Sequence, residues 1–292
     1  MKIEKKWSPE IFEEIIKQIK AEAHAYPIPP SLMKKVSDGS KYGNASIQNL
    51  NGLHGYNYQT LALLIKYLKP RNILELGSQL GLSAAMMYYE MEKDARMVTV
   101  DILKDQRFVP EEIWKDDRAR FVIGDVLDLN IYGDDIPVNV DFLFTDTEHF
   151  YKQLSNEFFI YEHLLANEAI ILIDDIHLND KGKFFDELQF SKWEIDLLAH
   201  PSGLGIVLYE RRGREVNLSV DERKTMAALA SARFWRDEAS SIANRRIRIN
   251  MPAIKQDIKK ELKRYPRIEK GIINHVAPAV RRTIRKIRKV FK

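Results

Sequence analysis

Residues 72–83 read Asn-Ile-Leu-Glu-Leu-Gly-Ser-Gln-Leu-Gly-Leu-Ser. A short apolar run ends in a Glu-x-Gly-x-x-x-Gly turn, and a helix-forming segment, 83–91, follows it. The glycines, Gly77 and Gly81, permit tight backbone geometry and let a ligand approach the main chain closely. This order of strand, glycine turn and helix is typical of the ligand-binding edge of an open α/β sheet. A strand and helix joined by incidental glycines is the plainer interpretation.

The charge of this turn narrows the class of ligand. The dinucleotide fingerprint is G-x-G-x-x-G, whose amides bind a pyrophosphate. Here the first Gly-x-Gly is missing, and Glu75 lies where it would repel a phosphate. The combination favours a cationic cofactor that carries an amino acid, and it resembles motif I of the class I S-adenosylmethionine-dependent methyltransferases. The resemblance implies that Glu75, Gly77, Gly81 and Ser83 bind S-adenosylmethionine.

Apolar strands alternate with helices around this motif. Near-continuous apolar strands separated by helices indicate a parallel sheet covered on both faces. Two further apolar runs, joined by a Pro/Gly turn, predict a final hairpin. The predicted fold is α/β, a doubly wound, seven-stranded, mostly parallel sheet with an N-terminal helical lid and a basic helical C-terminal extension. The strands are expected at 72–76, 96–101, 120–124, 140–145, 169–173, 193–199 and 204–209, and the helices at 82–92, 110–117, 150–165 and 181–190.

Three segments are expected along the chain. Residues 1–58 form an N-terminal helix, at 8–24, and a lid loop, because 26–57 is rich in Pro, Gly, Ser and Asn. Residues 59–210 form the domain that resembles the methyltransferases, and residues 211–292 form a basic helical extension.

Composition excludes several classes of protein. The 292 residues include no cysteine, so neither a disulfide framework nor a thiolate metal site can form. The basic start of the chain is not followed by the apolar region of a secretory signal. No apolar run approaches the roughly 18 residues of a membrane span. These features predict a cytoplasmic protein.

Each predicted parallel strand ends in an acid, and the carboxyl ends of such strands meet along one ligand-binding edge. Asp101, after the second strand, would accept hydrogen bonds from ribose hydroxyls. Asp125, after the third, is placed like the methyltransferase residue that meets the adenine amino group. A helix cap or turn is the plainer interpretation of Asp125.

The fourth and fifth strands end in Phe144-Thr-Asp-Thr-Glu-His149 and Ile173-Asp-Asp175. Three carboxylates, Asp146, Asp174 and Asp175, should converge there, and they repel one another unless a cation neutralises them. Oxygen ligands without cysteine suit Mg²⁺ or a similar divalent cation. His149, with an unperturbed pKa of about 6.5, suits removal of a proton from a metal-bound hydroxyl. A helix-capping histidine is the plainer interpretation.

This Asp-x-x-His sequence, with the later acidic pair, resembles the metal-dependent sugar and macrolide O-methyltransferases and the cephalosporin-hydroxylase-like group. The resemblance implies that the acids hold magnesium, with Asp146 and His149 catalytic and His149 as the base. Asp174 stands where those families usually carry Glu. The implied reaction is metal-assisted O-methylation of a sugar, glycan or related natural product. An RNA-modifying methyltransferase and a non-catalytic cofactor-binding protein are the alternatives.

The charge of the chain is divided unevenly. Residues 211–292 contain 24 Lys and Arg against 8 Asp and Glu, a net charge of +16, which leaves −12 for the preceding residues. Within 280–292, an apolar stripe at helical spacing is interleaved with basic residues, which is typical of a helix on an anionic membrane. A lipid-linked glycan would then be the acceptor. A solvated face, a homo-oligomer contact and nucleic acid are the alternatives; nucleic acid is disfavoured because no Asn/Asp-Pro-Pro-aromatic sequence follows the fourth strand. The stripe consists of Val280, Ile284, Ile287 and Phe291.

Overall fold

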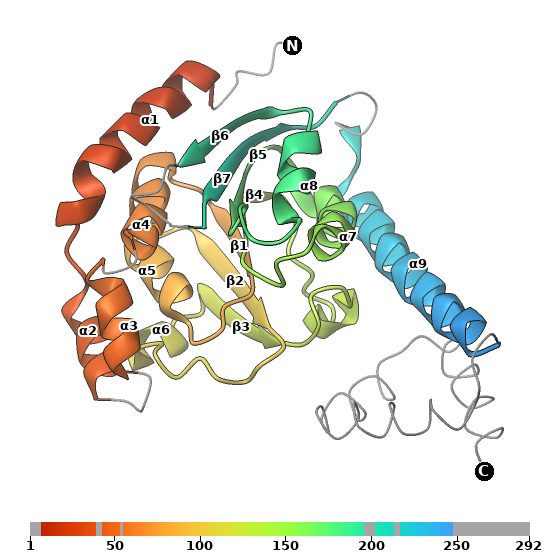
Figure 1. Cartoon of the computed structure of the whole chain (residues 1–292), viewed down its shortest axis with the longest axis horizontal. Helices are drawn as coiled ribbons and strands as arrows, with labels where there is room; N and C mark the ends of the chain where they lie inside the picture. Colours follow the sequence, from red (N-terminus) through yellow and green to blue (C-terminus); the bar gives the residue numbers. More distant parts are fainter. Residues whose placement is uncertain (1–6, 39–42, 53–54, 196–201, 213–216, 248–292) are drawn as a thin grey trace. The chain divides into compact units, whose positions relative to one another are not determined.

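A single mixed sheet forms the centre of the molecule (Figure 1). The computed structural model describes residues 7–38, 43–52, 55–195, 202–212 and 217–247. Among these residues the strand order is β3-β2-β1-β4-β5-β7-β6, with β7 antiparallel to both of its neighbours. This confirms the predicted seven-stranded, mostly parallel α/β sheet. The strands are β1 (Asn72–Leu76), β2 (Arg96–Asp101), β3 (Ala119–Ile123), β4 (Val140–Thr145), β5 (Leu165–Asp174), β6 (Ser191–Ile195) and β7 (Leu204–Glu210).

The order of the strands places a ligand crevice between β1 and β4. The chain leaves β1 for β2 and β3 on one side, then returns to β4 on the other side. Ligands bind open α/β sheets at such a switch point, outside the carboxyl ends of the strands. Leu76 is paired with Thr145, so Gly77 and Asp146 leave the two strands side by side.

Both faces of the sheet are covered by helices, which explains why its central strands are apolar throughout. Figure 1 shows α4 and α5 on one side of the sheet and α7 and α8 on the other. Successive side chains of β4 point to opposite faces of the sheet. Phe142 and Phe144 belong to the core cluster that includes α4 and α5, and Leu143 points to the other face. These helices are α4 (Asn57–Leu68), α5 (Leu82–Glu90), α7 (Tyr151–Tyr161) and α8 (Lys181–Glu187), and shorter helical pieces are α6 (Glu111–Trp114), η1 (Ala23–Ala25), η2 (Leu129–Tyr132) and η3 (Glu162–Leu164).

The first helix, α1 (Pro9–Glu22), forms within the range predicted for it. The Ser8 hydroxyl accepts a hydrogen bond from the Ile11 amide at 3.4 Å, and proline occupies the first turn. The buried face of α1 joins the core, where Phe12 stacks on Trp193 of β6 with ring centroids 5.3 Å apart.

The prediction that 26–57 is mostly loop was wrong. Two helices lie there, α2 (Pro30–Ser37) and α3 (Gly43–Leu50). Leu32 and Val36 lie one helical turn apart and are fully buried, which supplies the apolar face that holds α2 in place. The turn-forming composition masked this short stripe.

The helix α9 (Val220–Ile247) begins the basic extension with the predicted helical structure. The chain divides into two compact units, Met1–Ala227 and Ala228–Lys292. Within the first unit the buried Arg223 donates hydrogen bonds to the Leu165 carbonyl at 3.0 Å and to Asn167 at 2.7 Å. None of the described helices has the length and apolarity needed to cross a membrane. The predicted membrane-binding stripe, 280–292, lies outside the described residues.

The contact between Gly77 and the Asp146 carbonyl generates a prediction about stability. Gly77 has φ +96°, and a Cβ there would lie 2.0 Å from the Asp146 carbonyl oxygen. Gly133 also has positive φ, +63°, but a Cβ there would meet nothing within 4 Å. Gly133→Ala should therefore cost only backbone strain, about 1–3 kcal/mol, because φ 63° with ψ −133° is a combination that L residues rarely adopt. Gly77→Ala should cost more, because β1 and β4 must also separate.

Urea unfolding of the two variants measures this difference. Equal losses for both substitutions would mean that the β1–β4 junction relaxes without cost. Any side chain at position 77 collides first with the protein itself, so Gly77 substitutions cannot separate ligand binding from folding.

Candidate functional site

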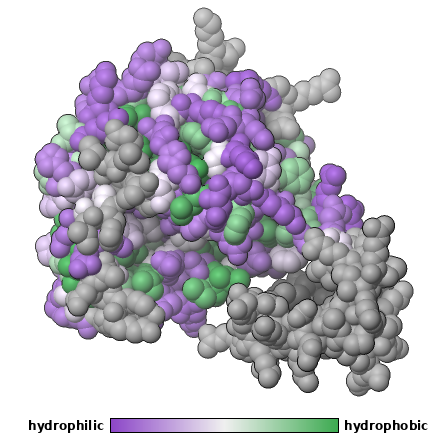
Figure 2. Space-filling model, viewed as in Figure 1, coloured by the Kyte–Doolittle hydropathy of each residue, from purple (hydrophilic) through white to green (hydrophobic). Residues whose placement is uncertain are grey.

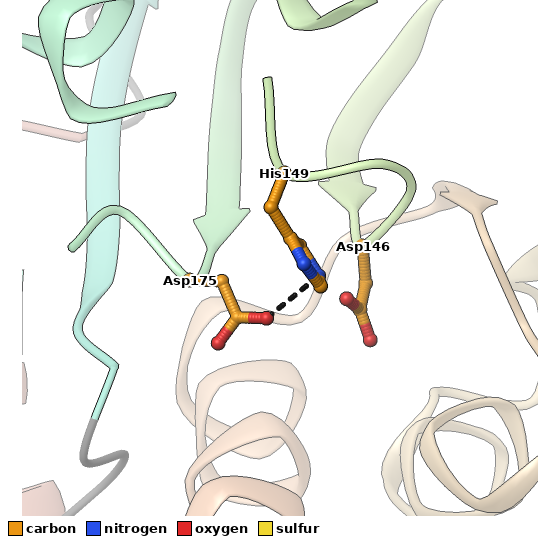
Figure 3. Close-up of side chains that lie close together, drawn as sticks. All are labelled: Asp146, His149 and Asp175. Atoms are coloured by element: carbon orange, nitrogen blue, oxygen red, sulfur yellow. Dashed lines mark ion pairs between the residues drawn. The ribbon is translucent and has the colours of Figure 1, made fainter. Parts of the chain in front are cut away.

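The carboxyl ends of β4 and β5 bring together an acidic cluster. Thr145 is paired with Ile173, so Asp146 and the Asp174–Asp175 pair leave neighbouring strands. Asp146, His149 and Asp175 each present a ligand atom, and these three atoms lie within 4.8 Å of one another. Figure 3 shows the three side chains converging, with His149 Nε2 2.8 Å from Asp175 Oδ2. Two carboxylates and an imidazole in this arrangement could hold a divalent cation.

Asp174 was predicted as a metal ligand, but it is not part of this trio. It is 3% exposed, and its side chain is hydrogen-bonded to Asp146. Asp175 has φ +55°, in the left-handed region, which turns the backbone immediately after Asp174. His149 takes the third place in the trio instead of Asp174. The metal role of each acid stays a prediction.

Burial and mutual repulsion perturb the two hydrogen-bonded acids. Burial, together with the charge of Asp175, raises the pKa of Asp174 to about 7. Burial and the charge of Asp174 raise the pKa of Asp146 well above its ordinary value. Burial and repulsion therefore favour the protonated forms of these two carboxyls, and a divalent cation would favour their ionised forms.

His149 does not serve as a helix cap. It lies in the loop before α7, whose N-cap residue is Phe150, and its side chain is 37% exposed. Its ring contacts Asp175 instead. The plainer interpretation of His149 as a capping histidine is therefore wrong, whereas its role as a base stays a prediction.

A buried glutamate on α7, Glu157, holds the loop that carries Asp146 and His149. It accepts hydrogen bonds from the hydroxyls of Thr145 at 2.7 Å and Thr147 at 2.5 Å, and from Gln153 at 2.7 Å. Burial raises the pKa of Glu157, and these hydrogen bonds act in the opposite direction. Sequence analysis missed this residue; the available signal was the pair of threonines that flank Asp146.

The glycine turn lines a pocket that meets the acidic cluster at Asp146. Asn57 and Tyr58, at the start of α4, also line it, and neither was among the predicted site residues. The pocket places the turn amides and a half-buried tyrosine next to the acids. Its lining consists of Asn57, Tyr58, Gly77, Ser78, Gln79, Leu80, Leu82, Ser83, Phe144 and Asp146.

Glu75, predicted to point into the crevice, is fully buried beside this pocket. It accepts a hydrogen bond from the Thr99 hydroxyl and is hydrogen-bonded to Ser83. Burial raises the pKa of Glu75 to about 7. Gly81 begins α5 with φ +84°, and a Cβ there would lie 2.3 Å from Val109. Gly81 therefore shapes the turn, and its predicted ligand contact stays a prediction.

Of the two acids assigned to ribose and adenine, Asp101 is the last residue of β2 and Asp125 lies in the turn after β3. The Asp101 carboxylate accepts hydrogen bonds from the amides of Gln79 and Leu103, both at 2.6 Å. Asp125 accepts one from the Leu127 amide at 2.9 Å, which is the turn contact that the plainer interpretation expects. Burial raises the pKa of Asp125. Neither residue lines the pocket, so both cofactor contacts stay predictions.

Residues 74–176 match the family model of a methyltransferase domain. The chain carries a methyltransferase domain. The matched segment runs from β1 to just beyond β5, and it includes both the glycine turn and the acidic cluster. This confirms the class I methyltransferase that the glycine turn predicted. No curated protein matches the chain by sequence.

One solved methyltransferase structure shares the fold of this domain, and two others align with it less closely. The O-methyltransferase TomG from Streptomyces achromogenes, which takes part in tomaymycin synthesis and was solved in complex with S-adenosylmethionine, aligns with a TM-score of 0.51 at 16% identity, over 66% of this chain and 95% of its own. A methyltransferase from Geobacter sulfurreducens aligns with a TM-score of 0.49 at 16% identity, over 66% and 96%. An O-methyltransferase from Bacillus cereus aligns with a TM-score of 0.44 at 18% identity, over 70% and 92%.

On the face shown in Figure 2, apolar residues are interspersed with polar ones. That face therefore does not add an apolar patch to the candidate site.

The buried Glu75 carboxyl should make stability depend on pH. Its pKa is about 7 in the folded chain, against an ordinary value of 4.5, so the folded chain binds more protons between these pH values. Glu75 therefore adds about 3 kcal/mol to the free energy of unfolding below pH 4.5, and this contribution is lost as pH rises to 7. Glu75→Gln should remove this part of the pH dependence.

Urea unfolding between pH 5 and pH 8, in chelator, measures the effect. Glu13→Gln, on the exposed face of α1, serves as the control. Parallel stability curves for wild type and Glu75→Gln would show that Glu75 titrates normally.

Proposed function

We propose that the protein is an S-adenosylmethionine-dependent O-methyltransferase, assisted by Mg²⁺ or a similar divalent cation. The observation that carries this proposal is the position of Asp146. Its side chain belongs to the acidic cluster, and the residue also lines the pocket at the glycine turn. A cofactor in the pocket and an acceptor at the cluster would therefore be neighbours. Methyl transfer requires that proximity, because positioning of the two reactants supplies much of the catalysis.

S-Adenosylmethionine suits the chemistry of the pocket. Its sulfonium is positive, and two acids lie at the pocket: Asp146, which is half-buried in the lining, and Glu75, which is fully buried beside it. The turn amides and the Ser83 hydroxyl could bind its polar groups. The methyltransferase match and the fold shared with TomG support this cofactor. We propose that Glu75, Gly77, Gly81, Ser83, Asp101 and Asp125 form its site.

The two carboxylates of Asp146 and Asp175 fit a hard divalent cation, which prefers oxygen ligands. Burial first, and repulsion between neighbouring carboxylates second, raise the pKa values of Asp146 and Asp174, and a cation would offset both effects. Asp146 and Asp175 would hold the cation, with Asp174 behind Asp146. Bound there, Mg²⁺ would orient an acceptor hydroxyl and make it more acidic.

His149 would remove the hydroxyl proton. Asp175 holds Nε2 of the imidazole at 2.8 Å, which leaves Nδ1 to accept the proton. The acceptor oxygen then forms a bond to the methyl carbon, the bond between sulfur and methyl breaks, and S-adenosylhomocysteine leaves. Glu157 keeps the His149 loop in position through Thr145 and Thr147.

The acceptor is the hydroxyl of a sugar, glycan or related natural product. The sequence Asp146-x-x-His149, with the acidic pair after β5, supports this class through its resemblance to the sugar and macrolide O-methyltransferases. With the basic tail on an anionic membrane, a lipid-linked glycan at the cytoplasmic surface would be the acceptor. Methylation of RNA, a homo-oligomer contact of the tail and cofactor binding without catalysis are the competing outcomes.

Methyl transfer to a panel of glycosides tests the function directly. Wild type should bind S-adenosylmethionine in calorimetry, lose turnover in chelator and regain it with Mg²⁺. His149→Ala should lose about 10²–10⁴-fold in rate with cofactor affinity unchanged. His177→Ala is the matched control, because His177 is half-exposed and pairs with Glu194 at 2.6 Å.

Each arm can fail separately. Full activity in excess chelator would remove the metal from the reaction, and near-normal turnover of His149→Ala would remove the base. Transfer to RNA but not to glycosides would favour the alternative acceptor, and cofactor binding without any transfer would favour the non-catalytic protein.

The tail should bind anionic vesicles. Seven basic side chains lie within 280–292, and each is worth about 1 kcal/mol near an anionic surface, with screening by salt. Replacing Ile284, Ile287 and Phe291 with Ser should weaken the binding, because the buried apolar area is lost. Leu229→Ser removes an exposed apolar side chain of α9 and is the control. Equal binding to neutral vesicles, or none to either, would leave an oligomer contact or nucleic acid as the role of the tail.

A further inference from the structure

Lys181, the first residue of α8, is fully buried. Lysine is almost never buried completely unless an opposite charge compensates it. Its Nζ donates no hydrogen bond to any residue that the structure describes. Ordinary capping or packing of α8 gives no reason for an ammonium at this position, so its compensation must come from charges at longer range.

Three acids supply that compensation, of which Asp174 and Glu157 are buried and Asp146 is half-buried. The Lys181 charge acts on Asp146 at the end of β4, on Asp174 at the end of β5 and on Glu157 of α7. In each case it favours the ionised carboxylate and so opposes the effect of burial on the pKa. One positive charge thus acts on acids from three separate elements. Asp146 belongs to the candidate metal site, Asp174 is hydrogen-bonded to Asp146, and Glu157 holds the loop that carries Asp146.

The start of α8 is fixed in this position. Asp180 accepts a hydrogen bond from the Tyr151 amide, at the start of α7, at 2.8 Å. Gly182 lies so close to the chain leaving β5 that a Cβ there would be 2.3 Å from the Ile176 carbonyl oxygen. Held on both sides, the lysine is kept beside the acids and away from solvent.

We propose that Lys181 is the resident positive charge of the acidic cluster. It holds Asp146, Asp174 and Glu157 in place when no divalent cation is bound, and so keeps the metal ligands positioned. It is a positioning residue, since it acts on the cluster through these acids. The inference rests on the proposed function only where it involves the divalent cation. The Lys181 ammonium and the cation would both act on the acidic cluster, so removal of the lysine charge should make the stability of the fold depend more on the cation.

Thermal unfolding of Lys181→Met, in chelator and in Mg²⁺, tests this dependence. The control is Lys183→Met, an exposed lysine of the same helix. We expect the Tm loss of Lys181→Met to be larger in chelator than in Mg²⁺, by about 2 °C or more for a chain of this size. A lysine that only fills space would lower the Tm equally in chelator and in Mg²⁺. Equal losses, together with no coupling between Lys181 and Asp174 in the double-mutant cycle, would overturn the proposal.

A double-mutant cycle in chelator tests the charge pairing without any metal. Asp174→Asn should recover part of the Tm loss of Lys181→Met, whereas Asp186→Asn, an exposed acid of α8, should be additive. If Lys181→Met alone is insoluble, recovery of soluble protein by Asp174→Asn but not by Asp186→Asn gives the same answer.

The proposed role of Lys181 would be overturned if its Tm loss were additive with both Asp174→Asn and Asp186→Asn. It would also be overturned if neither substitution recovered soluble protein. A third outcome separates the two proposals: Lys181 is coupled to Asp174, but Mg²⁺ does not change the Tm of the wild type. That outcome would keep Lys181 as the counter-charge and would refute the metal in the proposed function.

Discussion

The close approach of β1 and β4 at their carboxyl ends determines the geometry of the whole site. The Asp146 amide donates to the Leu76 carbonyl at 2.8 Å, and the Gly77 amide donates to Val100 at 2.8 Å. A hydrogen atom is all that fits between Gly77 and the Asp146 carbonyl. Because this junction is so tight, the glycine turn and the acidic cluster become adjoining walls of one crevice, and Asp146 belongs to both.

Concentrating carboxyl groups at that junction has an electrostatic cost, which is visible in the raised pKa values of Glu75, Asp146 and Asp174. Positive charge reduces this cost. Lys181 supplies one such charge within the chain, and a sulfonium cofactor and a divalent cation would supply the others. The site can therefore be understood as acids arranged to favour cations, with the hydrogen bonds of Glu157 keeping the arrangement rigid.

The parts of the molecule that could be predicted from sequence follow periodic or local rules. Strand β1 and the glycine turn were identified because apolar runs and glycines have direct backbone consequences, and the convergence of Asp146 and Asp175 followed from strand order. Other features depend on contacts between segments far apart in sequence. A helix was predicted from residue 181, but the polar sequence Asn-Asp-Lys-Gly-Lys around Lys181 gives no sign that its first residue is buried, because that burial depends on packing between segments such as α7 and α8. Similarly, α2 was missed because its stability comes from the core that it contacts.

The stacking of Phe12 on Trp193 has a consequence for how the chain acquires its structure. One ring belongs to the first described helix and the other to the strand at the far edge of the sheet, about 180 residues later. During synthesis, α1 leaves the ribosome long before β6 exists. The helix α4, which also packs against α1, is made much earlier, but the ring of Phe12 lacks its stacking partner until Trp193 has been made. Contacts between such distant residues slow folding. The N-terminal helix is thus among the first elements made and among the last that can be fully buried, and its apolar face is the surface most exposed to aggregation or chaperone binding in the meantime.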